Sequence, residues 1–111
     1  MKKKYLKVAE IGMTHDGSFG LAKQLTRAAV KAGANVVKYQ CHIPEFETTK
    51  DAPSPYYFKD ENRFEYFDRT KFSDSQFKEL HKLCKSLGVY SCISPFSIEA
   101  AEMCIKVGFD Y

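Results

Sequence analysis

One stretch, Ser73–Ile93, indicates the fold most clearly; it reads S-D-S-Q-F-K-E-L-H-K-L-C-K-S-L-G-V-Y-S-C-I. Ser73 and Gln76 have the spacing of a capping box, which starts a helix. Apolar residues then recur at helical spacing until Gly88, a residue type that commonly ends helices. Val89–Ile93 follows as a strand. The stretch therefore predicts a capped helix, a glycine stop and a strand.

The same order of signals occurs on both sides of this stretch. Ser18 can cap a helix that Gly33 ends, and Ser97 can cap another that ends at Gly108. Each glycine is followed directly by an apolar run. Because strands and helices alternate, the pattern predicts a parallel sheet with right-handed crossovers. The predicted strands are Tyr5–Ile11, Asn35–Cys41, Val89–Ile93 and the start of a fourth at Phe109–Tyr111.

The predicted fold class is α/β, and the chain holds about three and a half strand–helix units of it. A closed (β/α)8 barrel needs eight strands and about 250 residues, whereas the chain has 111 residues. We therefore expect residues 1–111 to be the N-terminal portion of such a barrel domain in a longer protein.

The periodic pattern disappears between the second strand and the stretch quoted above, for about 30 residues. Residues 42–72 contain prolines, scattered acidic residues and many aromatic residues. A connection of this length is usually a functional lid or binding loop, or else disordered, and the aromatic content favours packing. A short helix is predicted at Asn62–Asp68.

The composition excludes two classes of function. A net charge of +3, spread along the chain, does not form the basic face that nucleic-acid binding requires. No apolar run approaches the length of about 20 residues that a membrane helix needs. Lys7 and Glu10 interrupt the segment that follows Lys2, Lys3 and Lys4 before a signal-peptide core develops. We expect a cytoplasmic protein with no nucleic-acid or membrane partner.

The cysteines show no C-x-x-C pair and lie in apolar periodic segments, where cysteine behaves as a small hydrophobic residue. We therefore expect reduced thiols in the core rather than disulfides or metal ligands. They are Cys41, Cys84, Cys92 and Cys104.

Charged residues interrupt the first two strands near their carboxyl ends. Glu10 lies in V-A-E-I and Lys38 in V-V-K-Y-Q-C. Parallel α/β proteins place their active sites at this end of the sheet, so we expect the two side chains to be neighbours at one mouth. Ser94, just after the third predicted strand, would complete a row of three polar groups on adjacent strands.

The residue types leave more than one role open. Glu10 and Lys38 can form a buried ion pair with a purely structural role, although desolvation offsets most of the attraction in such pairs. Alternatively, Lys38 can be a Schiff-base nucleophile, or a cation that holds a phosphate or carboxylate. Spacing alone does not choose among these roles.

The histidines are weaker candidates. His15 and His42 follow the first two strands and could bind a metal beside Glu10, but they lack a ligand-spacing motif. A solvated or hydrogen-bonded histidine is the more common outcome. His81 lies within a predicted helix, and we expect it at the surface.

Three segments resemble successive landmarks of the sialic acid synthase family. They are A-E-I-G-M-T-H-D-G-S (Ala9–Ser18), A-G-A-N-V-V-K-Y-Q (Ala32–Gln40) and S-P-F-S (Ser94–Ser97). Enzymes of this family condense phosphoenolpyruvate with an N-acylmannosamine-type sugar to give a nine-carbon 2-keto acid. The resemblance implies a (β/α)8 barrel, followed in complete members by a small antifreeze-like domain, in a homodimer.

The resemblance also implies roles for individual residues. Glu10 matches the catalytic acid of the first strand, which contacts the sugar and the reacting centre. Lys38 matches the lysine that helps to hold phosphoenolpyruvate. Ser94 stands where the family commonly has threonine, and it keeps a hydroxyl that can bond phosphate. The family uses Mn²⁺ or Mg²⁺, whose ligands are implied to lie in later strands and not in this chain.

We therefore expect the N-terminal part of an N-acetylneuraminate synthase-like enzyme, inactive as this stretch alone. A second reading keeps the barrel but makes Lys38 the Schiff-base lysine of a pyruvate aldolase. A third reading is a non-catalytic half-barrel assembly module, whose exposed strand edges would require self-association or a partner. The sequence leaves open which N-acyl sugar is used, so related products such as legionaminic or pseudaminic acid remain possible.

Overall fold

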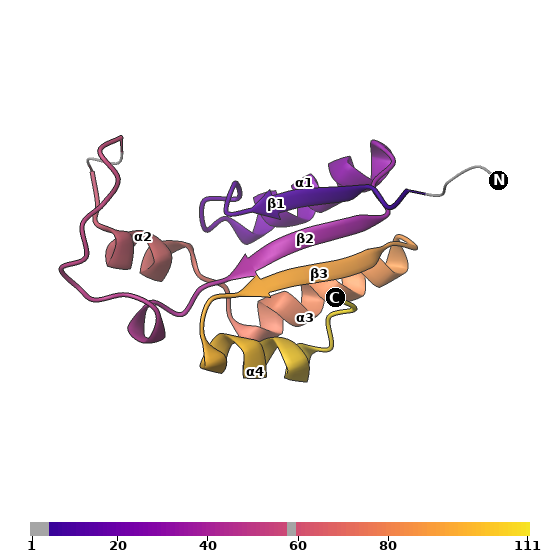
Figure 1. Cartoon of the computed structure of the whole chain (residues 1–111). Helices are drawn as coiled ribbons and strands as arrows, with labels where there is room; N and C mark the ends of the chain where they lie inside the picture. Colours follow the sequence, from indigo (N-terminus) through magenta and orange to yellow (C-terminus); the bar gives the residue numbers. More distant parts are fainter. Residues whose placement is uncertain (1–4, 58–59) are drawn as a thin grey trace.

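The computed structural model of the chain describes residues 5–57 and 60–111. Lys2, Lys3 and Lys4 lie outside these residues. Within them, three strands form one parallel sheet in the order β1-β2-β3, as predicted (Figure 1). The elements are β1 (Val8–Gly12), α1 (Phe19–Lys31), β2 (Val36–Cys41), the 3₁₀ helix η1 (Pro44–Phe46), α2 (Arg63–Thr70), α3 (Asp74–Ser86), β3 (Tyr90–Pro95) and α4 (Ile98–Val107).

The predicted helix starts are confirmed by their hydrogen bonds. The Ser18 hydroxyl accepts from the backbone N–H of Leu21, and Ser97 caps α4 in the same way. Ser73 makes the predicted capping box with Gln76. Such caps satisfy N–H groups that have no partner inside the helix, so short polar side chains fix where each helix begins.

The third strand is longer than the sequence predicted. It does not end at Ile93 but continues to Pro95, which is the register partner of Cys41. A proline is tolerated there because it occupies the last position of the strand, and the next N–H, from Phe96, donates to the Cys41 carbonyl at 3.2 Å. The extension places Ser94 inside β3 rather than after it.

The expected fourth strand begins beside β3. The N–H groups of Asp110 and Tyr111 both lie 3.1 Å from the Ser91 carbonyl, and the Ile93 N–H donates to the Tyr111 carbonyl at 3.0 Å. Residues 109–111 therefore make the first backbone bonds of a further ladder, although they are not yet a regular strand.

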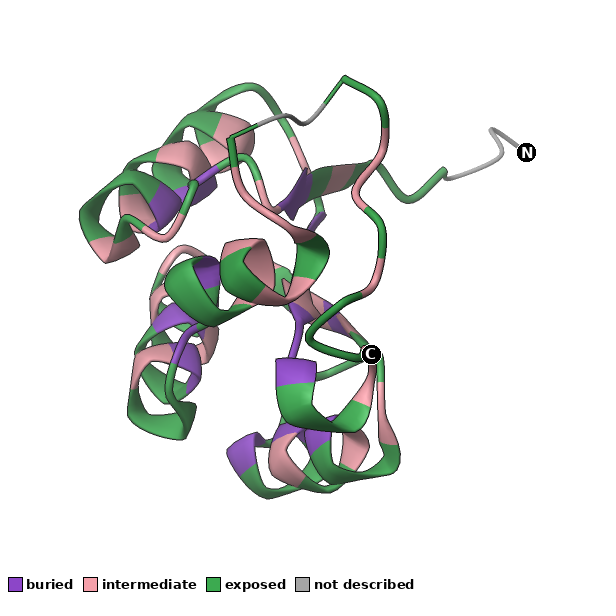
Figure 2. Cartoon of the chain, turned by 90° about the vertical axis from the view of Figure 1, so that its left-hand side faces the viewer, coloured by how far each residue is buried: buried purple, intermediate pink, exposed green. Residues whose placement is uncertain are grey.

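Helices α1, α3 and α4 pack against one side of the sheet (Figure 1). Val37, Tyr39 and Cys41 of β2 point to that side and are at most 1% exposed. The Tyr39 hydroxyl is bonded to Thr26 of α1 at 2.6 Å and lies 3.4 Å from the Cys84 sulfur of α3. Figure 2 shows that the buried residues gather between these elements. The core is therefore built on the helix side of the sheet.

The other side of the sheet carries no helix in the described part of the chain. It presents alternate residues of the strands, including Glu10, Lys38 and the partly exposed Cys92. Val8 and Tyr90, near the amino ends of β1 and β3, are about half exposed. This uncovered side is called the open face below.

The long connection between β2 and α3 lies beyond the carboxyl ends of the strands (Figure 1). It contains η1 and α2, and α2 starts at a capping box made by Asn62 and Glu65, which confirms the helix predicted there. No helix in residues 5–57 or 60–111 combines the length and apolar character needed to cross a membrane.

Candidate functional site

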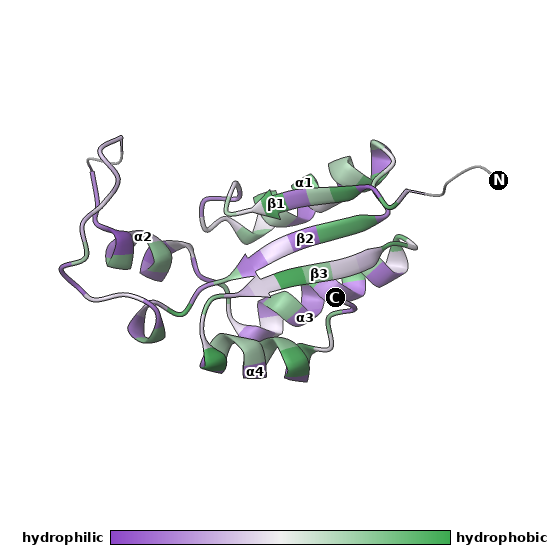
Figure 3. Cartoon of the chain, viewed as in Figure 1, coloured by the Kyte–Doolittle hydropathy of each residue, from purple (hydrophilic) through white to green (hydrophobic). Residues whose placement is uncertain are grey.

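The open face carries the predicted pair of charged residues. Glu10 and Lys38 are register partners on β1 and β2, and Lys38 Nζ lies 3.4 Å from Glu10 Oε2. In-register residues of a parallel ladder point to the same side, so the strands themselves bring these side chains together. Figure 3 shows that β2 is hydrophobic at its amino end and that hydrophilic residues begin near its middle.

Within the described chain the ion pair is not buried. The Lys38 and Glu10 side chains are 34% and 47% exposed. Their face of the sheet is uncovered, so neither charge loses most of its hydration. An exposed pair contributes little to stability, and either partner remains available to a charged ligand.

The predicted row of Glu10, Lys38 and Ser94 is displaced by one step. Lys38 is level with Cys92 on β3, whereas Ser94 is level with Gln40. The displacement follows from the β2–β3 register, because Lys38 pairs with Cys92 and Ser94 therefore lies two residues beyond the level of the ion pair. The polar groups therefore form two levels: Glu10 and Lys38 lie on the first, and Gln40 and Ser94 on the second, nearer the strand ends.

Gln40 joins the site at the second level, and sequence reasoning gave it no role. The β1–β2 register shifts between Glu10 and Gly12, and Gly12 has a positive φ of 55°. A Cβ atom at position 12 would lie 3.2 Å from Oε1 of Glu10 and 3.3 Å from the amide nitrogen of Gln40. The Glu10 and Gln40 side chains thus approach each other over a residue that has no side chain. The sequence did carry a signal for Gln40: it lies two residues after Lys38 in the same strand, and residues at this spacing point to the same face of a sheet.

His42, the first residue after β2, is buried and fully partnered. Its Nδ1 lies 2.9 Å from both carboxylate oxygens of Glu47, and its Nε2 lies 2.9 Å from Oε1 of Gln40. The ring is stacked between Phe67 and Phe96, with centroid distances of 3.9 and 4.1 Å. Burial lowers the pKa of His42 below its usual 6.5, and the Glu47 carboxylate acts in the opposite direction.

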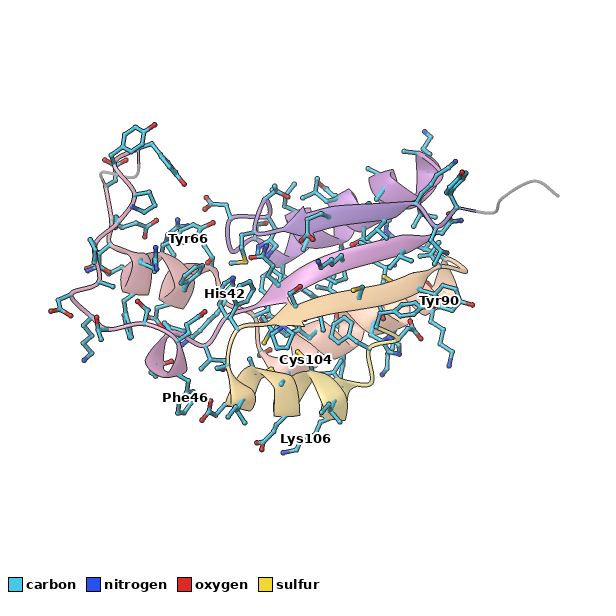
Figure 4. The ribbon with its side chains drawn as sticks, viewed as in Figure 1. His42, Phe46, Tyr66, Tyr90, Cys104 and Lys106 are labelled. Atoms are coloured by element: carbon cyan, nitrogen blue, oxygen red, sulfur yellow. The ribbon has the colours of Figure 1, made fainter. Side chains whose placement is uncertain are left out.

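A cavity of about 530 Å³ lies beside His42, between the long connection and the end of the sheet. Figure 4 shows Tyr66 of α2 above His42, near the carboxyl end of β2. The walls are mainly aromatic, with Glu47 and Arg63 as charged groups; the lining residues are His42, Glu47, Thr48, Pro55, Tyr57, Arg63, Tyr66, Phe67 and Phe96. The prediction that the aromatic residues of the connection pack is confirmed for Tyr66 and Phe67, which are partly buried, whereas Phe46, Tyr56 and Tyr57 are mostly exposed.

The long connection is held to the rest of the chain by a close backbone approach. A Cβ atom at Gly17, where φ is +83°, would lie 2.9 Å from the Arg69 carbonyl oxygen, so only glycine fits. The Arg69 guanidinium lies 3.1 Å from Asp16 Oδ1 and also bonds Glu61. These contacts fix α2 against the β1–α1 turn, and α2 supplies one wall of the cavity.

The other two histidines do not approach the pair on the open face. His15 is buried, stacks on Phe72 at 4.2 Å and accepts the Gly17 N–H at Nδ1; burial lowers its pKa. His81 was expected at the surface, but it is half-buried, and its Nδ1 bonds the Ser91 hydroxyl at 2.7 Å. It is buried on one side because Ser91 points toward the helix that carries it.

Metal and cysteine sites can be examined in the described residues. No group of three or more His, Cys, Asp or Glu side chains in residues 5–57 and 60–111 comes together to hold a metal ion. The cysteines are free thiols, as predicted; three of them are buried and Cys92 is intermediate.

Solved structures with the same fold include an N-acetylneuraminic acid (sialic acid) synthetase from Leptospira borgpetersenii serovar Hardjo-bovis. The two chains superpose with a TM-score of 0.73 at 21% identity, over 95% of this chain and 34% of that one. The fold is thus that of the N-terminal strand–helix units of a (β/α)8 barrel, as the sequence predicted.

Curated relatives include legionaminic acid, pseudaminic acid and N-acetylneuraminate-9-phosphate synthases. The N,N'-diacetyllegionaminic acid synthase of Campylobacter jejuni is 30% identical over 111 residues, which covers 96% of this chain and 33% of the relative. The mouse N-acetylneuraminate-9-phosphate synthase is 31% identical over 99 residues, or 86% of this chain and 28% of the relative. The chain thus spans about a third of the length of these relatives.

The match to a family extends over most of the chain. The profile of the NeuB family matches residues 25–111, from the middle of α1 through the last described residue. This segment contains Lys38, Gln40, the long connection and Ser94. The chain therefore belongs to the NeuB family.

Proposed function

We propose that the chain forms the first part of a phosphoenolpyruvate-dependent synthase. This enzyme would be a carbon–carbon bond-forming transferase that joins phosphoenolpyruvate to an N-acylmannosamine-type sugar and releases a nine-carbon 2-keto acid. One observation carries the proposal: the partly exposed Glu10–Lys38 pair lies on the open face of the parallel sheet, one level before Gln40 and Ser94, and these lead to the carboxyl ends of the strands, where barrel enzymes bind substrate. The family membership supports the same activity.

Lys38 and Ser94 are proposed to bind the anionic donor. The Lys38 ammonium already has a carboxylate partner at 3.4 Å, and an incoming phosphate or carboxylate can replace that partner. Ser94 lies two residues farther along the neighbouring strand, where its hydroxyl can donate to a second oxygen of the same group. Together they would neutralise and orient phosphoenolpyruvate.

Glu10 is proposed to act on the acceptor sugar. When an anion takes Lys38, the Glu10 carboxylate is released to accept a hydrogen bond from a sugar hydroxyl or to move a proton at the reacting centre. The enol carbon of phosphoenolpyruvate attacks the open-chain aldehyde and forms the new carbon–carbon bond. Water then adds to the cationic centre, and phosphate leaves from the tetrahedral intermediate.

The aromatic cavity is proposed to border the sugar. Its walls combine stacked rings with the charged groups of Glu47 and Arg63, a mixture suited to a polar ligand that has apolar faces. The cavity shares His42 with the hydrogen-bonded chain that reaches Gln40, so it adjoins the second level of the site.

The resemblance implies a divalent metal, Mn²⁺ or Mg²⁺, but the described residues do not fit one. No three potential ligands converge in residues 5–57 and 60–111. Ligands for such a metal would have to come from residues outside this sequence, and no step proposed here passes through it.

Substitution of the ion pair tests the proposal in the complete polypeptide. Glu10→Gln and Lys38→Ala should each reduce kcat/KM for condensation at least 100-fold, because each removes a charge that contacts a substrate. Lys106→Ala, which removes an exposed lysine of α4, is the matched control and should keep full activity (Figure 4). Normal turnover by a Glu10→Gln, Lys38→Ala double variant would overturn the proposal.

A Schiff-base pyruvate aldolase that uses Lys38 is the alternative enzyme. Nucleophilic attack requires a free amine lone pair, which an ammonium paired with a carboxylate lacks, so the ion pair favours anion binding. Borohydride trapping with pyruvate separates the two activities. Covalent labelling of Lys38 would identify the aldolase, and the absence of label together with phosphate release would support the synthase.

The assembly and compartment of the enzyme remain proposals. A homodimer rests on the family resemblance, as does the inactivity of this stretch on its own. A cytoplasmic location is supported by four free thiols, which are typical of a reducing compartment. The half-barrel assembly module remains the alternative for a chain without activity, because the open face would then need a partner.

A further inference from the structure

A series of hydrogen bonds runs from the long connection, residues 42–72, to the open face of the sheet. Glu47 lies 2.9 Å from Nδ1 of His42, and Nε2 of His42 lies 2.9 Å from Oε1 of the Gln40 amide. The amide nitrogen of Gln40 faces the other way, toward Gly12 and Glu10, so the structure holds the amide in the orientation that requires both ring nitrogens of His42 to donate. His42 therefore lies between a buried carboxylate and a side chain of the proposed substrate site.

The number of protons on His42 decides which end of the Gln40 amide can form a hydrogen bond with it. A carboxylate only accepts hydrogen bonds, so Nδ1 must carry a proton to donate to Glu47. A neutral imidazole has one N–H, which leaves Nε2 as an acceptor, and the amide NH₂ of Gln40 must then face His42. When His42 is an imidazolium, Nε2 also donates, and the amide oxygen of Gln40 must face it instead.

The opposite end of the Gln40 amide changes accordingly. Neutral His42 leaves the Gln40 carbonyl oxygen, an acceptor, pointing toward Glu10 and Lys38. Protonated His42 leaves the NH₂ group, a donor, at the same point. Gly12 keeps this space free, since any side chain at position 12 would touch both Glu10 and Gln40.

We propose that His42 is a positioning residue that sets the direction of the Gln40 amide, so that protonation of His42 replaces an acceptor by a donor beside Glu10 and Lys38. Its catalytic consequence rests on the proposed function, whereas the amide reversal does not. The acceptor form can bind the Lys38 ammonium or a substrate hydroxyl. The donor form binds the Glu10 carboxylate and withdraws it from the substrate.

The aromatic surroundings of His42 oppose the imidazolium that the amide orientation seen in the structure requires. Phe67 from α2 and Phe96 after β3 cover the two faces of the ring, and burial lowers its pKa. The charged group that contacts the His42 ring is Glu47 from the connection, and its other hydrogen-bond partner, Gln40 from β2, is neutral. Arg63 and Tyr66 of α2 line the adjoining cavity. The change to the donor form is therefore expected on acidification.

Nuclear magnetic resonance of the native polypeptide, labelled with ¹⁵N at histidine and glutamine, tests the inference without any assay of activity. Above the pKa of His42, a scalar coupling across the N–H···N bond should join Gln40 Nε2 to His42 Nε2. The coupling should disappear as His42 gains a proton, and the Gln40 amide shifts should follow the same titration curve.

His15 is the matched control, because it is also buried and stacked but contacts no glutamine in the structure. Its titration should leave the Gln40 signals unchanged. A proton on Nε2 of His42 at high pH, or Gln40 signals that ignore the His42 titration, would overturn the inference.

Kinetics of the complete enzyme supply the second readout. As pH falls through the His42 pKa, KM should rise about threefold or more while kcat changes little, because Glu10 loses its contact with the substrate. In Gln40→Met, which has no amide to reverse, this step in KM should vanish. Persistence of the step in Gln40→Met would count against His42 as its cause. If the enzyme condenses no substrate at all, the proposed function fails, whereas the coupling experiment still decides the amide reversal.

Discussion

Two carboxylate–nitrogen pairs, each with its nitrogen in or just after β2, differ in exposure, distance and in what holds them together. Glu10 and Lys38 are joined at 3.4 Å with side chains 47% and 34% exposed, whereas Glu47 and His42 are joined at 2.9 Å with side chains 8% and 4% exposed. Register in the sheet places the first pair. Aromatic stacking on His42 and the fold of a long connection place the second.

The difference separates the pair proposed to bind substrate from the pair that supports the connection. Both charges of the exposed pair keep much of their hydration, so exchanging one partner for a substrate costs little. The buried pair has no water to replace a lost partner, so it has to remain intact for the connection to keep its shape. The exposed and the buried pair should therefore respond differently to substitution and to acid.

Removal of the buried carboxylate should have the largest effect on stability. Glu47→Ala leaves the Nδ1 donor of His42 without a partner inside the protein, and we expect the free energy of unfolding to fall by about 1–3 kcal/mol. Urea denaturation of the variant and the parent measures the loss. Glu45→Ala removes an exposed carboxylate of η1, the short helix that Glu47 directly follows, and is the matched control. Equal losses in the two variants would show that burial does not distinguish them.

The parts of the fold that depend on local signals could be predicted from the sequence. Ser18, Ser73 and Ser97 each cap the helix assigned to them, because a cap is a bond between residues three apart. The approach of Glu10 to Lys38 was also predictable, since adjacent parallel strands with one charge near each end leave few other arrangements.

Features that depend on distant segments could not be predicted. The exposure of Glu10 depends on what covers the open face, and no local pattern reports that. The level of Ser94 depends on the β2–β3 register, which pairs Lys38 with Cys92 and Gln40 with Ser94 and which no local pattern reports. The support of Gln40 by His42 and Glu47 requires a connection of about 30 residues to fold back, which periodicity does not encode.

Acidification should destabilise the protein through its buried histidines. The pKa values of His15 and His42 lie below 6.5 in the folded chain, so the unfolded chain binds protons first as pH falls. Their contribution is complete above pH 6.5 and is lost as pH falls through the folded values. The slope is at most about 1.4 kcal/mol per pH unit for each histidine.

Urea midpoints between pH 7 and pH 5 measure this loss. His15→Phe keeps a ring against Phe72 and removes one titrating group, so its stability should fall less steeply with acid than that of the parent. A parent protein whose stability stays level or rises over this interval would contradict the expected sign.

The smallest effect on stability should come from the exposed pair. Glu10→Gln removes an ion pair whose partners are both more than a third exposed, and the free energy of unfolding should change by about 0.5 kcal/mol or less. Urea denaturation at neutral pH measures it beside Glu47→Ala. A small loss here, together with the loss of activity expected for the same variant, would separate binding from folding at Glu10. A loss as large as that of Glu47→Ala would instead mean that Glu10 supports the fold. A carboxylate whose role is only to bind substrate contributes little to folding stability, so the Gln side chain of the same shape should replace it at little cost.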